Sequence, residues 1–384
     1  MIKEVIILGN HIQGLGISRI AARLGYKVTL YNNSSISVAR FSNTCSKFCK
    51  FKDVNHLLDI LINKEINKNE ALLIPTNDML VGFISDNYDV LNEKYMLSNS
   101  IKDITELAFN KIKTYKMAIR AGVKMPESFF PNSIEELNEI ADKIDYPVII
   151  KPAIMYNFYK KSGKKVFLCN SRQELIENYN QALKIIKNDE VIVQEFLTGG
   201  AKNLYSFASY ASKGEVFGSF IANRIRQKPM DFGVATTFAK TVISERIEQL
   251  ALSLVKEMNY SGLSEIEFMY DDKIQDYKLI EINPRTWKWH TMSNIVGINL
   301  IEMLIKDLNG ENVEYQKNTT ENLGWIEQLT DFFIMFSEVF KGRMSLKEYF
   351  NTLKIPKEYA TWDRKDPLPG VMYILLSPYF YLKR

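Results

Sequence analysis

The sequence predicts an α/β domain followed by an α+β region, and both its length and its element order support this fold class. The 384 residues are enough for two or three domains at roughly 100 to 200 residues each. A strand at Glu4–Leu8, a glycine-bearing turn at Gly9–Gly16, a helix at Ile17–Leu24 and a strand at Lys27–Tyr31 predict a βαβ unit, and thus a parallel sheet. Beyond residue 103, strands and helices mix without regular alternation, which indicates an α+β region.

The composition excludes several classes of protein. With 46% hydrophobic and 24% charged residues, the chain is neither a disordered tail, nor a collagen, nor a disulfide-stapled miniprotein. A net charge of +4 gives no general case for binding nucleic acid. Three cysteines and three histidines are too few for a disulfide framework or a zinc knuckle, so we expect a cytoplasmic protein with free thiols.

The apolar stretches are too short for a membrane span. None reaches the roughly 18 to 20 residues that a spanning helix needs. The best candidate, Val371–Leu382, is broken by Ser377-Pro378, so we expect a packed terminal element there. An interfacial contact with a membrane is the alternative.

The N-terminal turn lacks two features of a nicotinamide site. Gly14 and Gly16 are followed by Arg19 where the fingerprint needs a third glycine. Asn32 and Asn33 stand where an acidic residue would bind the ribose. We therefore expect a Rossmann-like fold that binds no dinucleotide.

A third predicted strand, Ala71–Ile74, ends at the polar segment Pro75–Asp78. Ligands of open α/β sheets bind at the carboxyl ends of the strands. We therefore expect Thr76 and Asp78 to face a substrate.

Two predicted strands later in the chain carry acidic residues. They form a hairpin around the polar turn at residues 271–276. Side chains alternate along a strand, so Glu265 and Glu267 share a face, as do Glu281, Asn283 and Arg285. Converging carboxylate and amide oxygens suit Mg²⁺, and a nearby arginine can neutralise a phosphoryl group during its transfer.

Further segments suit a phosphorylated ligand and a carboxylate. Lys151 ends an apolar strand, where a phosphate would compensate its charge. Arg224 and Arg226 are two residues apart on a predicted strand end, so both should face one way and bind a carboxylate. Trp287 and His290 could wall a substrate pocket. The chain also carries, in order, Asn110-Lys111 with Ala121-Gly-Val123, Tyr146-Pro-Val-Ile-Ile-Lys151-Pro, Val191–Leu197, Arg224–Pro229 with Asp231-Phe-Gly233, and Glu281-Ile-Asn-Pro-Arg285 to His290.

In order and spacing, these motifs resemble the ATP-grasp superfamily, and within it the uncharacterised carboxylate–amine ligases that are similar to carbamoyl-phosphate synthase. The resemblance covers roughly residues 1–310. It implies ATP and Mg²⁺ as cofactors, with Mn²⁺ as an alternative metal. It assigns Lys111 and Lys151 to the nucleotide phosphates, Gln194, Glu195, Phe196 and Leu197 to adenine, and Glu267, Glu281 and Asn283 to the metal. Together with the reading of the residues themselves, we expect catalysis from Arg285, Arg226 and Lys151. We expect substrate contacts from Thr76, Asp78, Arg224, Trp287 and His290.

The resemblance also implies a domain order and a reaction. Residues 1–103 would form a Rossmann-like domain, 104–310 the ATP-grasp domain with a small nucleotide-gripping subdomain at 120–197, and 311–384 a C-terminal extension. The protein would join a small-molecule carboxylate to an amine through an acyl phosphate, releasing ADP and phosphate. The sequence leaves open whether the protein forms a homodimer. No nucleic-acid partner is expected.

Two departures from the family's pattern leave other functions open. The loop at 153–165 has one glycine where the family has a glycine-rich loop over the phosphates, and 199–203 offers no acid for the ribose. A nucleotide-binding but inactive regulatory module is therefore one alternative. A carboxylase that uses bicarbonate and a nicotinamide dehydrogenase are the others.

Overall fold

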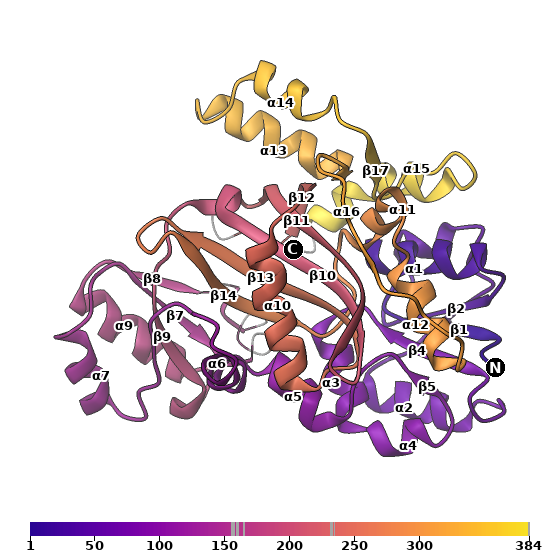
Figure 1. Ribbon diagram of the computed structural model, residues 1–384, viewed down its shortest axis with the longest axis horizontal. Helices are drawn as coiled ribbons and strands as arrows, with labels where there is room; N and C mark the ends of the chain where they lie inside the picture. The colour runs from indigo at the N-terminus through magenta and orange to yellow at the C-terminus, as the bar shows by residue number, and fades with distance from the viewer. Residues whose placement is uncertain (155–157, 159–160, 164–165, 231–232, 234, 383–384) are drawn as a thin grey trace.

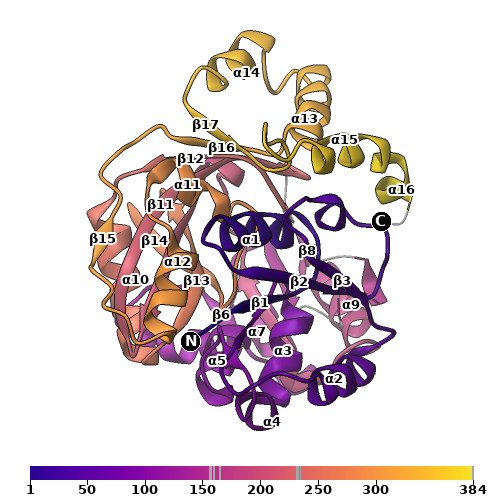
Figure 2. The same ribbon diagram turned by 90° about the vertical axis from the view of Figure 1, so that its right-hand side faces the viewer.

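The computed structural model describes residues 1–154, 158, 161–163, 166–230, 233 and 235–382, and within them the strands form three sheets (Figures 1 and 2). Most of the loop at 153–165 and residues 231 and 232 lie outside the described residues. The α/β plus α+β class is confirmed, because a parallel sheet is followed by two largely antiparallel ones.

The N-terminal sheet is parallel, with strand order β3-β2-β1-β4-β5. Parallel strands need crossover connections, and helices supply most of them. The strands are β1 (Glu4–Leu8), β2 (Lys27–Asn32), β3 (Lys47–Lys50), β4 (Ala71–Pro75) and β5 (Met96–Leu97), and the helices are α1 (Ile12–Arg23), the 3₁₀ turn η1 (Ala39–Phe41), α2 (Val54–Asn63), α3 (Asp78–Asp86) and α4 (Tyr88–Asn92).

Helix α1 begins at Ile12, so the prediction of a glycine turn through Gly16 is wrong. Both internal glycines are needed for close packing. A Cβ on Gly14 would lie 2.6 Å from the carbonyl oxygen of Gly9. One on Gly16 would lie 2.7 Å from the ring of His290. The glycines therefore let the helix approach its own turn and the segment after β14.

The predicted helix at 104–121 is divided in two. Helix α5 (Lys102–Phe109) ends before Asn110, and α6 (Lys111–Arg120) begins after it. The Asn110 side chain accepts hydrogen bonds from the backbone N–H groups of Ile112 and Lys113, which caps α6. The cap places Lys111 in the first turn of α6.

A small antiparallel sheet follows, with strand order β6-β9-β7-β8. Two helices pack with it around a separate hydrophobic core. The elements are β6 (Ser128–Phe129), α7 (Ile134–Ala141), β7 (Val148–Pro152), β8 (Phe167–Cys169), α9 (Arg172–Leu183), η2 (Asn188–Glu190) and β9 (Val191–Glu195).

The central sheet has strand order β14-β13-β10-β11-β12-β16-β17, with β15 beside β11. The predicted acidic hairpin is confirmed, since β13 and β14 pair antiparallel with Glu265 opposite Asn283 and Glu267 opposite Glu281. The elements are η3 (Gly200–Asn203), β10 (Leu204–Ser212), β11 (Glu215–Lys228), β12 (Ala235–Val242), α10 (Glu245–Met258), β13 (Gly262–Asp271), β14 (Asp276–Asn283), η4 (His290–Met292), α11 (Ser293–Val296) and α12 (Leu300–Leu308).

The C-terminal segment adds strands to the central sheet and carries helices that project from the body (Figure 1). None of the described helices is both long and apolar enough to cross a bilayer. The boundaries at 103 and 310 remain predictions. The elements are β15 (Gln316–Lys317), β16 (Gly324–Ile326), α13 (Gln328–Phe340), α14 (Leu346–Thr352), β17 (Lys357–Tyr359), α15 (Leu368–Leu375) and α16 (Ser377–Leu382).

One hydrophobic core joins the N-terminal sheet to the central sheet. It contains Leu15 of α1, Phe220 of β11, Trp287 and Leu304 of α12. Because these side chains pack in one cluster, the N-terminal and central sheets keep a fixed position relative to each other.

Candidate functional site

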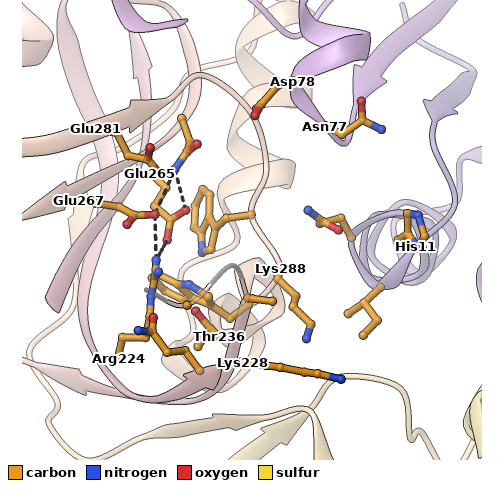
Figure 3. A pocket seen from close by; sticks show the side chains of 18 of the residues that line it. His11, Asn77, Asp78, Arg224, Lys228, Thr236, Glu265, Glu267, Glu281 and Lys288 are labelled. Carbon is orange, nitrogen blue, oxygen red and sulfur yellow. Dashed lines mark hydrogen bonds and ion pairs between the residues drawn. The ribbon is translucent and has the colours of Figure 1, made fainter. Parts of the chain in front are cut away.

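A cleft of about 1990 Å³ lies between the N-terminal sheet, the two other sheets and the C-terminal helices. The ends of β1 and β4, strands β11, β13 and β14, and helices α13 and α16 contribute to its walls. Figure 3 shows Glu265, Glu267 and Arg224 on one side of it and His11 on the other. The cleft is at the carboxyl ends of parallel strands, where such sheets bind ligands.

The acidic side chains of β13 and β14 meet at the cleft wall. The Asn283 amide donates hydrogen bonds of 3.2 Å to both Glu265 and Glu267. Its oxygen accepts a bond of 3.1 Å from Arg285. Glu281 stands opposite Glu267 in the strand pair. The structure thus brings the three predicted metal-binding residues together, with Glu265 added to them.

Two cationic side chains neutralise these acids. Arg224 Nη2 lies 2.8 Å from Glu267 Oε1 and 3.4 Å from Glu265 Oε1. Lys111 Nζ lies 3.1 Å from Glu281 Oε2. Burial opposes the charge on Lys111, but the Glu281 carboxylate outweighs it and raises the pKa of Lys111.

The acid cluster still has an excess of negative charge. Burial and the neighbouring Glu267 raise the pKa of Glu265 to about 7, despite Arg224. In the described part of the chain, no three His, Cys, Asp or Glu side chains already form a metal cage. Two carboxylates and an amide oxygen fit Mg²⁺, which binds few protein ligands and completes its shell with waters and phosphates. Binding there would require Lys111 or Arg224 to shift.

Lys151 lines the same cleft. Its side chain is buried, and Nζ donates a 2.6 Å hydrogen bond to the hydroxyl of Tyr115. That hydroxyl also accepts from Gln194 and donates to the carbonyl of Ile280. Burial and the charge of Lys111 lower the pKa of Lys151 to about 7. A phosphate in this position would favour the charged lysine.

The end of β9 forms the adjoining wall. Gln194 is buried and donates a 2.7 Å hydrogen bond to Ser128. Glu195 forms an ion pair with Lys278, which occupies its carboxylate. Phe196 and Leu197 line the cleft beyond it. The predicted adenine role of these four residues stays a prediction.

Arg285 connects the acid cluster to the N-terminal sheet. Its Nε lies 2.5 Å from the Asp78 carboxylate at the start of α3. The hydroxyl of Thr76, in contrast, donates to the backbone carbonyl of Leu8, and Thr76 is buried outside the cleft lining. The expectation that Thr76 faces a substrate is therefore wrong, because its hydroxyl joins β1 to β4.

Arg226 does not share a face with Arg224, so that prediction is also wrong. A bulge at residue 225 shifts the register with β12 and turns the two side chains apart. Arg226 is fully buried and binds both carboxylate oxygens of Asp331 on α13 at 2.8 Å. Its guanidinium also stacks on Phe238 and Tyr349. Arg226 anchors α13 and is absent from the cleft lining.

His290 also lies outside the cleft lining, contrary to expectation. Its Nδ1 is 2.8 Å from the backbone carbonyl of Trp287, and the ring packs beside Gly16 of α1. Burial lowers the pKa of His290 to about 4, so the ring is neutral. It supports the junction between the sheets, whereas Trp287 does line the cleft.

Several buried polar atoms in the cleft wall lack a hydrogen-bond partner among the described residues. They are both amide atoms of Asn10, Oε1 of Gln227, Nε1 of Trp287 and Nε of Arg224. Buried polar groups are nearly always satisfied, so these atoms indicate a polar ligand. Neither Asn10 nor Gln227 was predicted as a site residue, although Gln227 lies in the Arg224–Pro229 motif. The position of Asn10 just after β1 was the available signal.

The fold and this cleft define an ATP-grasp protein, in which a large and a small sheet enclose a nucleotide site. Residues 110–315 match the family described as the carbamoyl-phosphate synthase L chain, ATP binding domain. The chain belongs to this family, and the predicted superfamily is confirmed.

Individual relatives are distant. The multifunctional protein pyrABCN of Emericella nidulans is 24% identical over 325 residues, which are 80% of this chain and 14% of the relative. The D-aspartate ligase of Enterococcus faecium is 21% identical over 244 residues, 62% of this chain and 58% of the relative. The chain thus spans less than two thirds of the length of either.

A solved structure shows the same fold. The biotin carboxylase of Campylobacter jejuni, in a complex with an ATP ligand, aligns with a TM-score of 0.67 at 18% identity. The alignment covers 82% of this chain and 73% of that chain.

Proposed function

We propose that this protein is an ATP- and Mg²⁺-dependent ligase that joins a carboxylate to an amine through an acyl phosphate. The observation that carries the proposal is the β13–β14 pair, which places Glu267, Glu281 and Asn283 beside Arg285 and Lys111 in one cleft. The similarity to a D-aspartate ligase supports an amide-forming reaction.

Lys111 and Lys151 would bind the phosphates of ATP. Lys151 is buried and Lys111 is half-buried in the cleft wall, and Lys111 already lies next to Glu281 of the proposed metal site. A bound Mg²⁺ would neutralise phosphate oxygens and orient the terminal phosphoryl group. Glu267, Glu281 and Asn283 would hold it, with Glu265 adding negative charge behind them.

Arg285 would act during phosphoryl transfer. The substrate carboxylate oxygen bonds to the γ-phosphorus as the bond from that phosphorus to the bridging oxygen of ADP breaks. The amine nitrogen then bonds to the acyl carbon, phosphate leaves and the nitrogen loses a proton. The Arg285 guanidinium, fixed by Asp78 and Asn283, would neutralise the charge that develops in the first step.

The carboxylate substrate would lie between the acid cluster and the N-terminal sheet. Arg224 Nε, Trp287 Nε1 and the amide of Asn10 offer donors there, and Gln227 offers an acceptor. A ligand with both acceptor and donor groups, as in an amino acid, would satisfy this set.

The test is ADP release over a matrix of carboxylates, including both enantiomers of aspartate, and amines, with phosphorus NMR of the products. We expect ADP and phosphate only when both substrates are present. Glu281→Gln should abolish turnover, and Arg285→Ala should lower it by roughly 10- to 1000-fold. Glu93→Gln removes an exposed carboxylate outside the cleft and is the matched control.

Three outcomes would contradict the proposal. AMP with pyrophosphate would mean adenylation. Turnover with bicarbonate in place of the carboxylate would mean a carboxylase. Nucleotide binding without turnover across the whole matrix would mean a regulatory module.

A further inference from the structure

Helix α13 exposes aromatic side chains and buries acids. Phe332, Phe336 and Phe340 recur every fourth residue and form its outer face, with 46%, 55% and 94% of their surface exposed. Asp331, Ile334, Met335 and Glu338 are buried on the inward face. The outer face of a surface helix is normally polar, whereas that of α13 is apolar. The outer face of α13 therefore needs an apolar environment of its own.

The apolar surface continues beyond α13. A groove of about 500 Å³ separates α13 from α14, β17 and α15, and Phe332 lies at its edge. Tyr359, Trp362 and Ile374 also line this groove, and each is at least 42% exposed. We call this groove and the outer face of α13 the aromatic surface. Large apolar surfaces of this kind mark interaction sites.

The same segment is strongly basic. Residues 341–384 contain nine Lys and Arg but four Asp and Glu, so their net charge of +5 exceeds the +4 of the whole chain. Three of the four acids are at least partly buried, and Asp366 and Asp363 form ion pairs with Arg19 and Arg23 of α1. Lys341 and Arg343 likewise pair with Glu338 of α13. The remaining exposed charge is mostly positive, from Lys347, Lys354, Arg364 and Lys365.

Exposed aromatic groups next to a lysine-rich segment fit a membrane better than a protein. Protein interfaces are depleted in lysine, whereas an anionic membrane surface attracts it and accepts phenylalanine among its acyl chains. We propose that the aromatic surface and the basic residues of segment 341–384 dock this protein on a membrane surface rich in anionic phospholipids.

Vesicle flotation of the full chain, without ATP, tests this proposal. We expect binding to phosphatidylcholine vesicles that contain about a third phosphatidylserine, at least tenfold weaker binding to phosphatidylcholine alone, and release by salt. Phe336→Ser/Phe340→Ser and Lys347→Glu/Lys354→Glu should each weaken binding at least tenfold.

Matched variants separate this surface from others. Ile119→Ser removes a 65% exposed apolar side chain from α6, and Lys143→Glu/Lys187→Glu reverses two exposed charges outside the segment. Both should bind as the wild type does. All variants should keep the unfolding temperature of the wild type, which shows that they fold.

Two results would overturn the proposal. One is no binding, or equal binding to both kinds of vesicle. The other is a wild-type dimer in light scattering that Phe336→Ser/Phe340→Ser dissociates, with no vesicle binding, because the surface would then join two copies of the chain. Neither result depends on the proposed ligase activity, which is measured separately.

Discussion

The buried position of Lys151 works against the stability of the fold. The folded protein holds this ammonium in a buried position that lowers its pKa from 10.5 to about 7. The unfolded chain therefore binds one more proton than the folded protein between these pH values, so the folded state loses stability as the pH falls through this range. Below pH 7 the penalty is complete. A bound phosphate would remove it.

We predict that Lys151→Met raises the unfolding temperature and weakens ATP binding. The gain in stability should be largest near pH 6.5 and should shrink as the pH approaches 10.5, because the wild-type lysine then loses its charge in both states. Thermal unfolding across pH and calorimetric ATP titration measure the two effects.

Lys116→Met, which neutralises an exposed lysine on the same helix as Lys111, is the control and should change neither quantity. A Lys151→Met variant that unfolds at a lower temperature than the wild type would show that the charge of Lys151 is already compensated.

Strand β11 carries two arginines with different environments: Arg224 lines the cleft, and Arg226 is buried against α13. Arg226 and Asp331 are both fully buried, and Thr237 donates a further hydrogen bond to Asp331. Removing one partner of a buried pair costs about 3–5 kcal/mol, while replacing both by apolar residues is often neutral. The pair can therefore be tested without loss of the fold.

We predict that Arg226→Met destabilises the protein by about 3–5 kcal/mol and that Arg226→Met/Asp331→Leu recovers most of this. Denaturant unfolding measures both. The double variant should retain turnover, since Arg226 lies outside the cleft. A double variant that folds but has no turnover would mean that Arg226 takes part in the reaction.

Strand and helix patterns predicted most elements but not their exact orientation. Alternation of side chains was enough to predict the β13–β14 hairpin and its converging acids. It could not predict the bulge at residue 225, because one extra residue leaves the composition of β11 unchanged while it turns Arg226 to the other face. The Asn110 cap was visible in principle, as asparagine is a preferred N-cap.

Over the whole molecule, the order and spacing of motifs were enough to predict the family and the fold class. They did not predict contacts between distant segments, since nothing in local sequence encodes them. Arg19 of α1, for example, forms a buried ion pair with Asp366, 347 residues later. His290 looked like a pocket residue for the same reason, because its contact with Gly16 joins two sheets.

The ion pairs in the cleft nearly balance its acidic side chains against its basic ones, so the charge of a ligand should affect how well it binds. Among the described residues, the charged side chains that line the cleft are five acids and six bases: Asp78, Glu195, Glu265, Glu267 and Glu281, with Lys111, Lys151, Arg224, Lys228, Arg285 and Lys288. A divalent cation alone would add positive charge to the cleft, and a nucleotide alone would add negative charge. When both ligands bind, their charges largely cancel, and the net charge of the cleft changes little.

Metal and nucleotide should therefore bind synergistically. We predict that each raises the affinity for the other at least tenfold, after correction for their complex in solution, and linkage requires the two factors to be equal. Calorimetric titrations of each ligand, with and without the other, measure this. Independent binding would mean that Lys111 and Arg224 remain on their acids when the cleft fills, so the free protein would already be arranged as the loaded one.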